Sequence, residues 1–77
     1  MRDEVRAAVA SAVRAEMARK GVDQRTLAKQ AGKSQAWLSK LTNGKTACRV
    51  EDLVLLAEAL DIPLSALIPQ AAAGRAA

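Results

Sequence analysis

The stretch QRTLAKQAGKSQAWLSKLTNG, residues 24–44, constrains the fold more than any other part of the chain. Its apolar residues Leu27, Ala28 and Ala31 recur at offsets of three and four, the spacing of one face of a helix. Gly32 follows at the point where a helix can end, because glycine takes the left-handed conformation without a Cβ clash. We therefore predict a short helix that ends at this glycine.

A second short helix is predicted in the same stretch. Ser34 stands where its hydroxyl can accept a backbone N–H of a new first turn. Leu38 and Leu41, three residues apart, should face inward. Asn43-Gly44 then ends the helix with two residues that tolerate positive φ.

The two helices should lie close together at their turn. Ala28 and Gly32 are placed where the helices would cross, and we expect their small size to let the backbones approach. Two short helices joined in this way form a helix-turn-helix, whose second helix, here 34–43, is offered to the major groove of DNA.

The ordered residues of this stretch resemble the lambda-repressor-like helix-turn-helix family, the Cro and Xre-type regulators. The matching features are Gln24, Leu27-Ala28, Gly32, Ser34-Gln35, Leu38, Leu41 and Asn43-Gly44-Lys45-Thr46. The likeness continues through 53–62 and 64–68, the family's fourth and fifth helices, and covers roughly residues 13–68. The resemblance implies an all-α, five-helix lambda-repressor-like DNA-binding domain of phage or bacterial origin.

Composition independently favours an all-α fold. The apolar half of the 77 residues is mostly Ala, Leu and Val, with one Trp and no Phe or Tyr. No segment alternates with period two for long enough to indicate a strand. We expect one domain over residues 1–69, followed by a flexible tail or linker over 70–77, which has no large apolar residue to bury.

The first helix is predicted to start at an Asp3 cap and to run to about Lys20. Its apolar stripe comprises Val5, Val9, Val13 and Met17, widened by Ala8 and Ala12. The turns over 3–12 exceed what the family needs. They extend the core, contact DNA or pack on another copy, and the sequence does not choose among these roles.

After a loop over 45–50, Glu51-Asp52 lies in the first turn of the predicted fourth helix, where acidic residues favour the helix dipole. The buried stripe of this helix is Leu53, Leu56, Ala57 and Leu60. We expect Ile62-Pro63 to break the helix. Leu64, Leu67 and Ile68 should then close the core in a last short helix.

The distribution of charge points to a polyanionic partner. The net charge is +4, and residues 21–50 hold six basic side chains against one acidic side chain, Asp23. Positive charge therefore gathers on the predicted helix-turn-helix, as DNA binding requires. The alternative is a basic face that is merely solvated.

Other classes of protein are poorly supported. Cys48 is the only cysteine, so it forms no internal disulfide, and no apolar run is long enough to span a membrane. The N-terminus does not have the pattern of a secretory signal, so we expect a cytoplasmic protein. There is no histidine, no Gly-rich phosphate loop and no metal-ligand spacing. We expect neither an enzyme nor any cofactor, metal, membrane or small-molecule substrate.

Four side chains of the second helix are predicted to reach base edges, as the resemblance also implies: Gln35, Ala36, Ser39 and Lys40. Gln35 can present its amide to adenine, Lys40 can donate to guanine, and the methyl of Ala36 can meet a thymine methyl. The alternative is that Gln35 only caps the helix and Lys40 only touches phosphate.

A further set of residues is predicted to contact the DNA backbone: Gln24, Lys33, Ser34, Trp37, Asn43, Lys45, Thr46 and Arg49. The resemblance implies this role for Gln24, which also supports Gln35 in the family, and for Asn43, Lys45 and Thr46. Phosphate contacts position a protein and make its binding salt-dependent, but they do not choose a sequence. Trp37 should pack against the first and second helices, with its indole N–H as a candidate phosphate donor.

The chain departs from the family pattern at two places. Where the family usually carries an Arg–Glu ion pair, this chain has Met17 and Thr42, so no single charge is left and we expect little loss of stability. Lys33 replaces the small aliphatic residue that is usual in the turn, which suggests a phosphate contact.

Together these features predict a repressor, with sequence-specific binding to a double-stranded DNA operator for transcriptional control. The resemblance adds that family members often bind as homodimers. Two alternatives stay open, namely an antitoxin that binds both DNA and a toxin, and a protein-interaction module that kept the fold and lost DNA reading.

Overall fold

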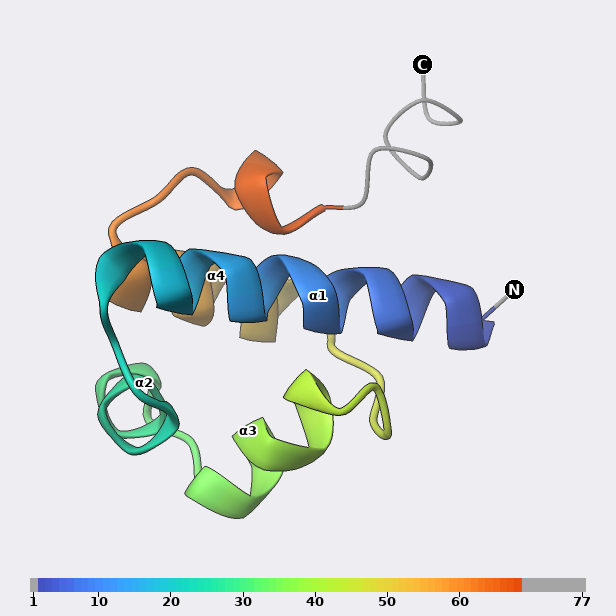
Figure 1. Ribbon diagram of the computed structural model, residues 1–77, viewed down its shortest axis with the longest axis horizontal. Coiled ribbons are helices and arrows are strands. Elements are labelled where there is room, and N and C mark those ends of the chain that lie inside the picture. The colour runs from blue at the N-terminus through green and yellow to red at the C-terminus, as the bar shows by residue number, and fades with distance from the viewer. Residues whose placement is uncertain (1, 69–77) are drawn as a thin grey trace.

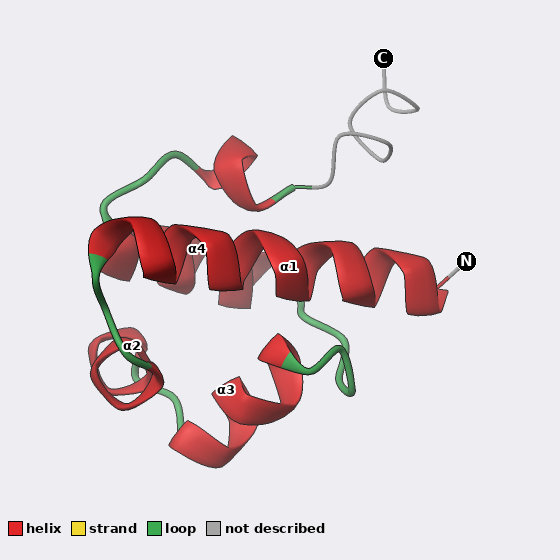
Figure 2. Ribbon diagram, viewed as in Figure 1, coloured by secondary structure: helices red, strands yellow, loops and turns green. Residues whose placement is uncertain are grey.

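The computed structural model describes residues 2–68 of the 77-residue chain. Within that range it contains four α-helices, one short 3-10 helix and no strand (Figure 1, Figure 2). The elements are α1 (Arg2–Lys20), α2 (Gln24–Ala31), α3 (Gln35–Thr42), α4 (Val50–Leu60) and η1 (Leu64–Leu67). The all-α class is confirmed for these residues, and the tail predicted over 70–77 lies outside them.

The helices pack around one core. α1 packs against α3, α4 and η1, while α2 packs against α3 and α4. In Figure 1, α1 crosses the middle of the molecule, with η1 on one side and the α2–α3 pair on the other. The side chains that are almost completely buried come from every element: Val13, Leu27, Leu38, Leu41, Thr42, Leu56 and Leu67.

The long helix α1 uses only part of its predicted apolar stripe. Val9, Val13 and Met17 are buried, as predicted, and Ala10 joins them. Val5 keeps 39% of its surface exposed, because a repeat of four drifts around a helix with 3.6 residues per turn. The N-terminal turns of α1 also extend past the other helices (Figure 1). The helix already begins at Arg2, so the prediction that Asp3 is its N-cap was wrong.

The turn between α2 and α3 has the predicted backbone. Gly32 is left-handed, with φ 72°, and the N–H of Lys33 donates to the carbonyl of Ala28 at 2.8 Å. Ser34 caps α3, its Oγ accepting the backbone N–H of Trp37 at 3.0 Å. A Cβ placed on Gly32 would meet no atom within 4 Å. Close helix packing is therefore not the reason for this glycine, contrary to our prediction, and its positive φ is.

The ends of α3 and α4 differ from the prediction in detail. After α3 only Gly44 has a positive φ, of 70°, whereas Asn43 has φ −97°. α4 runs from Val50 to Leu60, and the residue that caps its end, Asp61, is left-handed with φ 55°. The helix thus stops before Ile62-Pro63, so the proline is not what ends it. The backbone N–H of Ile62 donates to the carbonyl of Ala57 at 3.0 Å and closes this end.

The fifth element is smaller than predicted, and the five-helix count is not confirmed. η1 is a single 3-10 turn between Pro63 and Ile68, both of which have extended backbones. Side chains three apart align in a 3-10 helix, so Leu64 and Leu67 both pack on the core. Ile68 keeps 37% of its surface exposed, and its predicted place in the core was wrong.

Candidate nucleic-acid interface

α3 divides into a buried face and an exposed face. Leu38, Leu41 and Thr42 are buried against the rest of the protein. The four residues predicted to reach bases lie away from this buried face: Gln35, Ala36 and Lys40 are exposed, and Ser39 is half-buried. The structure therefore brings together a small surface on which Gln35, Ser39 and Lys40 offer hydrogen-bonding groups beside the methyl group of Ala36.

Several predicted backbone contacts lie at the two ends of α3. Ser34 is exposed at its start, although its hydroxyl already accepts the N–H of Trp37. Asn43 is exposed at its end, where its side-chain amide donates to the carbonyl of Ser39 at 2.9 Å. The polar side chains of both residues thus also fix the ends of the helix.

The connection from α3 to α4 carries three more residues of the predicted set. Lys45 and Arg49 are exposed, and Thr46 is half-buried. The exposed basic residues of the middle of the chain belong to α2, α3 and this connection: Arg25, Lys29, Lys40, Lys45 and Arg49. The exposed acidic residues that follow, Glu51, Glu58 and Asp61, belong to α4 and its end. These exposed positive charges thus lie on α3 and on the segments that precede and follow it in the chain, whereas these exposed negative charges lie further on, in α4 and at its end.

Gln24 joins the start of α2 to the end of α3. Its Nε2 donates to Oγ1 of Thr42 at 2.9 Å, and the Thr42 hydroxyl donates to the carbonyl of Ser39 at 3.1 Å. The amide of Gln24 is thus bound to Thr42, whereas the resemblance implied support of Gln35. The guanidinium of Arg14 also donates to the carbonyl of Thr42. Hydrogen bonds to Thr42 therefore link α1 and α2 to α3 at the position of the family's ion pair, and Met17 is simply part of the core.

The side chain of Lys33 contacts two other residues of the protein. Its Nζ lies 2.7 Å from Oδ1 of Asp52 in α4 and 5.1 Å from the centre of the Trp37 ring. Trp37 is partly buried and packs on the core. The hydrogen bond from Lys33 holds the pKa of the Asp52 carboxyl below its usual 3.8. Sequence reasoning missed this pair, because nothing local links two residues on different elements.

Asp23 is a second acidic residue whose role was missed. Its side chain caps α2 by accepting the backbone N–H of Thr26 at 2.8 Å, and this bond lowers the pKa of the Asp23 carboxyl. A signal was present in the sequence, because Asp before a predicted helix is among the preferred N-caps.

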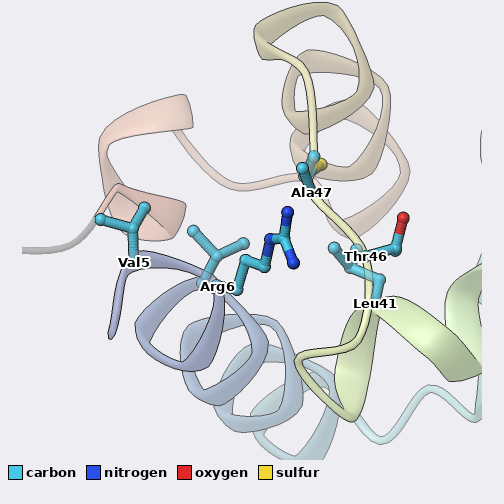
Figure 3. A pocket seen from close by; sticks show the side chains of 7 residues that line it. Val5, Arg6, Leu41, Thr46 and Ala47 are labelled. Carbon is cyan, nitrogen blue, oxygen red and sulfur yellow. The ribbon is translucent and has the colours of Figure 1, made fainter. Parts of the chain in front are cut away.

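A small apolar pocket lies between the N-terminal half of α1 and the α3–α4 connection (Figure 3). Its volume is about 180 Å³, and Val5, Val9, Leu41, Ala47 and Cys48 supply much of its lining. Burial raises the pKa of the Cys48 thiol to about 11, so the reactive thiolate is scarce at neutral pH. The lining is therefore mainly apolar, and Arg6 and Thr46 add polar groups to it.

Two further properties bear on the kind of site present. Within residues 2–68, no helix combines the length and the apolar character needed to cross a membrane. Among the described side chains, no group of three or more His, Cys, Asp and Glu is arranged to hold a metal ion. The polar face of α3 and its basic surroundings remain the candidate site.

Comparison with known proteins agrees with this geometry. The HTH_3 family model, described as helix-turn-helix, matches residues 13–67. The clp gene regulator ClgR from Corynebacterium glutamicum is 33% identical, with a TM-score of 0.81, over 95% of this chain and 94% of that one. The restriction-modification controller protein C.AhdI from Aeromonas hydrophila is 25% identical, with a TM-score of 0.79, over 82% of this chain and 96% of that one.

A transcriptional regulator from Vibrio cholerae shares the fold at 19% identity and a TM-score of 0.83, over 87% of this chain and 38% of its own. No curated protein sequence matches the chain. The match to the family model nevertheless covers well over half of the residues and includes the entire helix-turn-helix. The chain therefore belongs to the HTH_3 helix-turn-helix family, the Xre-type and lambda-repressor-like DNA-binding regulators.

Proposed function

We propose that the chain is a repressor that binds a double-stranded DNA operator in the bacterial cytoplasm, with α3 in the major groove. The observation that carries the proposal is the exposed polar face of α3, which holds Gln35, Ser39 and Lys40 opposite buried leucines. A helix with such a face fits the major groove, where each base pair presents its own pattern of donors and acceptors.

Four side chains give this reading face its chemistry. Gln35, in the first turn of α3, offers a donor and an acceptor to adenine N6 and N7. Lys40, in the last turn, donates to guanine O6 and N7. Ala36 beside Gln35 is small enough to let the helix lie deep, and its methyl meets a thymine methyl. Ser39 adds a hydroxyl between them.

The backbone contacts flank the reading face. Lys45, Thr46 and Arg49 follow α3 and approach the sugar–phosphate chain, together with Asn43 at the helix end. Gln24 and Ser34 lie at the starts of α2 and α3, where free backbone N–H groups favour phosphate. The indole N–H of Trp37 is a further donor. These contacts set register and affinity, whereas sequence choice comes from the reading face.

We further propose that two copies bind paired half-sites about one helical turn apart, as in other helix-turn-helix dimers. Val50 and Val54 lie one turn apart on α4, and both are exposed, Val50 to 67% of its surface. Apolar surface of this kind suits a contact between copies. Sedimentation of the free protein and of its DNA complex measures this directly, and one copy per operator would contradict it.

A pair of lysine variants tests the division between reading and backbone contacts. Lys40→Ala should relax preference at one base position, with a cost of about 1–3 kcal/mol there. Lys45→Ala should weaken binding to all sequences about equally and lower the salt slope by about 1. Affinities for a panel of duplexes at several salt concentrations give both quantities. The same behaviour in both variants would contradict the assignment of Lys40 to bases.

An antitoxin is the second candidate, and exposed apolar side chains favour it. Val5 on α1 and Ile68 after η1 each keep more than a third of their surface exposed. An antitoxin would form a stable complex with the product of a neighbouring gene when the two are expressed together. Val5→Asp with Ile68→Asp should then break that complex and leave DNA affinity unchanged. Absence of any complex would exclude this candidate.

A further inference from the structure

The ion pair between Lys33 and Asp52 joins the helix-turn-helix to α4. Nζ of Lys33 and Oδ1 of Asp52 are 2.7 Å apart, and the two side chains keep only 29% and 12% of their surfaces exposed. The other carboxylate oxygen of Asp52 accepts the backbone N–H of Arg49 at 3.4 Å, at the start of α4. Lys33 thus contacts a carboxylate that α4 itself helps to hold in place.

Lys33 is also fixed on its own side. Its backbone N–H is bound to the carbonyl of Ala28, so the residue follows α2 with a set backbone direction. Ser34, the next residue, caps α3. The pair therefore joins α4 to the short segment that decides where α3 begins and in which direction it points.

Trp37 makes the same connection from within α3. The Lys33 ammonium lies 5.1 Å from the centre of its ring, within the range of a cation–π contact. Trp37 is in the first turn of α3, two residues after Gln35. A side chain of the reading helix thus packs under the same ammonium that binds Asp52.

This geometry argues against Lys33 as a phosphate contact. A phosphate would have to compete with a carboxylate at 2.7 Å and would draw the ammonium away from the Trp37 ring. Removing Lys33 from a half-buried pair would leave the Asp52 charge without its partner, which destabilises the folded state. Lys40, Lys45 and Arg49 are exposed, and none of them is within ion-pair distance of an acidic side chain among the described residues.

We infer that Lys33 is a positioning residue: through Asp52 and Trp37 it sets the orientation in which α3 presents Gln35 and Lys40 to the bases. The inference rests on the proposed function and deepens it. The Lys33–Asp52 pair affects discrimination between bases because it sets the angle of α3. It adds nothing to the counterion release that phosphate contacts produce.

The test combines three variants with two controls. Lys33→Met, Asp52→Asn and the double variant form a cycle, and Lys33→Arg keeps the charge. Lys29→Met is the matched control, because Lys29 is an exposed lysine of α2. Each protein is measured for the ratio of affinities between a preferred and a shuffled duplex, for the salt slope, and for unfolding without DNA. Trp37 is the only tryptophan, so its fluorescence reports on the pair directly.

We expect Lys33→Met and Asp52→Asn to lower the affinity ratio by a similar factor, roughly tenfold, which is the size of one weakened base contact. The double variant should lose little more than either single one, because the two residues act as a unit. The salt slope should match that of the wild type, and Lys33→Arg should retain most of the ratio. Both single variants should change Trp37 fluorescence, whereas Lys29→Met should not.

Three results would overturn the inference. If Asp52→Asn tightens binding to all duplexes and Lys33→Met lowers the salt slope by about 1, Lys33 is a phosphate contact restrained by Asp52. If the cycle is additive in unfolding and fluorescence is unchanged, the pair does not couple. If the wild-type protein discriminates and both variants discriminate equally well, the pair has no positioning role. A wild-type protein that binds no duplex would instead overturn the proposed function, while the unfolding cycle still decides whether the pair couples.

Discussion

Two connections flank α3, and they hold it in different ways. The turn before it, 32–34, is joined to α2 by a backbone hydrogen bond, to α3 by the Ser34 cap and to α4 by the Lys33–Asp52 pair. The longer connection after it, 43–49, has backbone bonds near its ends, and its middle lines the apolar pocket. The cations of this connection, Lys45 and Arg49, are exposed.

The difference suggests a division of labour around one helix. On the proposed function, the turn would fix the direction of α3, because base contacts tolerate a misplacement of only about 0.5 Å. On the proposed function, the later connection would carry charge toward the DNA backbone, where contacts tolerate small shifts and give affinity without sequence choice. Changes in the turn should therefore affect stability and discrimination, and changes in the later connection should affect overall affinity.

The largest loss of stability is expected from the buried face of α3, the helix between the two connections. Leu38 is completely buried, so Leu38→Ala should lower the free energy of unfolding by about 2–5 kcal/mol through lost contacts and a cavity. Leu55→Ala on α4 is the matched control, because Leu55 is 39% exposed, and it should cost less than about 1 kcal/mol. Denaturant unfolding measures both. Equal losses would mean that α3 is not anchored by its buried face.

The glycines of the two connections should respond alike. Gly32 and Gly44 have φ of 72° and 70°, so replacing either with alanine should cost about 1–2 kcal/mol of stability. A Cβ on Gly32 meets nothing within 4 Å and one on Gly44 meets the Cα of Ala7 at 3.7 Å, an ordinary contact. Asparagine at either position should cost less than alanine, because it tolerates this conformation. A neutral Gly32→Ala would contradict the account of the turn.

Loss of a hydroxyl should lower stability more in the turn before α3 than in the connection after it. Ser34→Ala removes the cap of α3 and should cost about 1 kcal/mol of stability, and Ser34→Asp should restore it. Thr46→Ala removes a hydroxyl from the later connection and should change stability by less than about 0.5 kcal/mol. Thermal unfolding of the four proteins is sufficient. If Thr46→Ala lowers stability more than Ser34→Ala, the later connection and not the turn holds α3 in place.

The smallest effect on stability is expected from the Asp52 carboxyl, and it should depend on pH. The pKa of the Asp52 carboxyl is lowered in the folded state, so its contribution to stability is complete above the usual value of 3.8. That contribution is lost as the pH falls through the folded pKa. The stability difference between wild type and Asp52→Asn should thus be constant from pH 7 to about 5 and shrink below about pH 4. A difference that vanishes near pH 6 would contradict the pairing with Lys33.

Local chemistry made much of the helix-turn-helix predictable from sequence. The end of α2 follows from one glycine and the start of α3 from one serine, and the buried leucines of α3 follow from helical spacing. Each of these features depends on residues within four positions of one another, so a pattern in the chain is enough to reveal it. The fold family could be predicted from the sequence because these features occur in the order that is typical of the family.

Contacts between distant elements were not predictable. Arg14, Gln24 and Thr42 meet only once α1, α2 and α3 are packed, as do Lys33 and Asp52. Val5 fitted the apolar stripe of α1, but no neighbouring element covers it fully. Asp61 takes a positive φ that its residue type only mildly favours, so the end of α4 was assigned to the proline instead. The role of Lys33 therefore had to come from the structure.

The proposed role of α3 is to read DNA sequence. The most direct measurement is enrichment of bound duplexes from a random DNA pool, carried out at two salt concentrations. If α3 reads sequence, we expect a recurrent motif that persists at the higher salt, and a repeated half-site if two copies bind together. Salt-sensitive binding without any motif would contradict it, because the protein would then hold the DNA backbone without reading the bases.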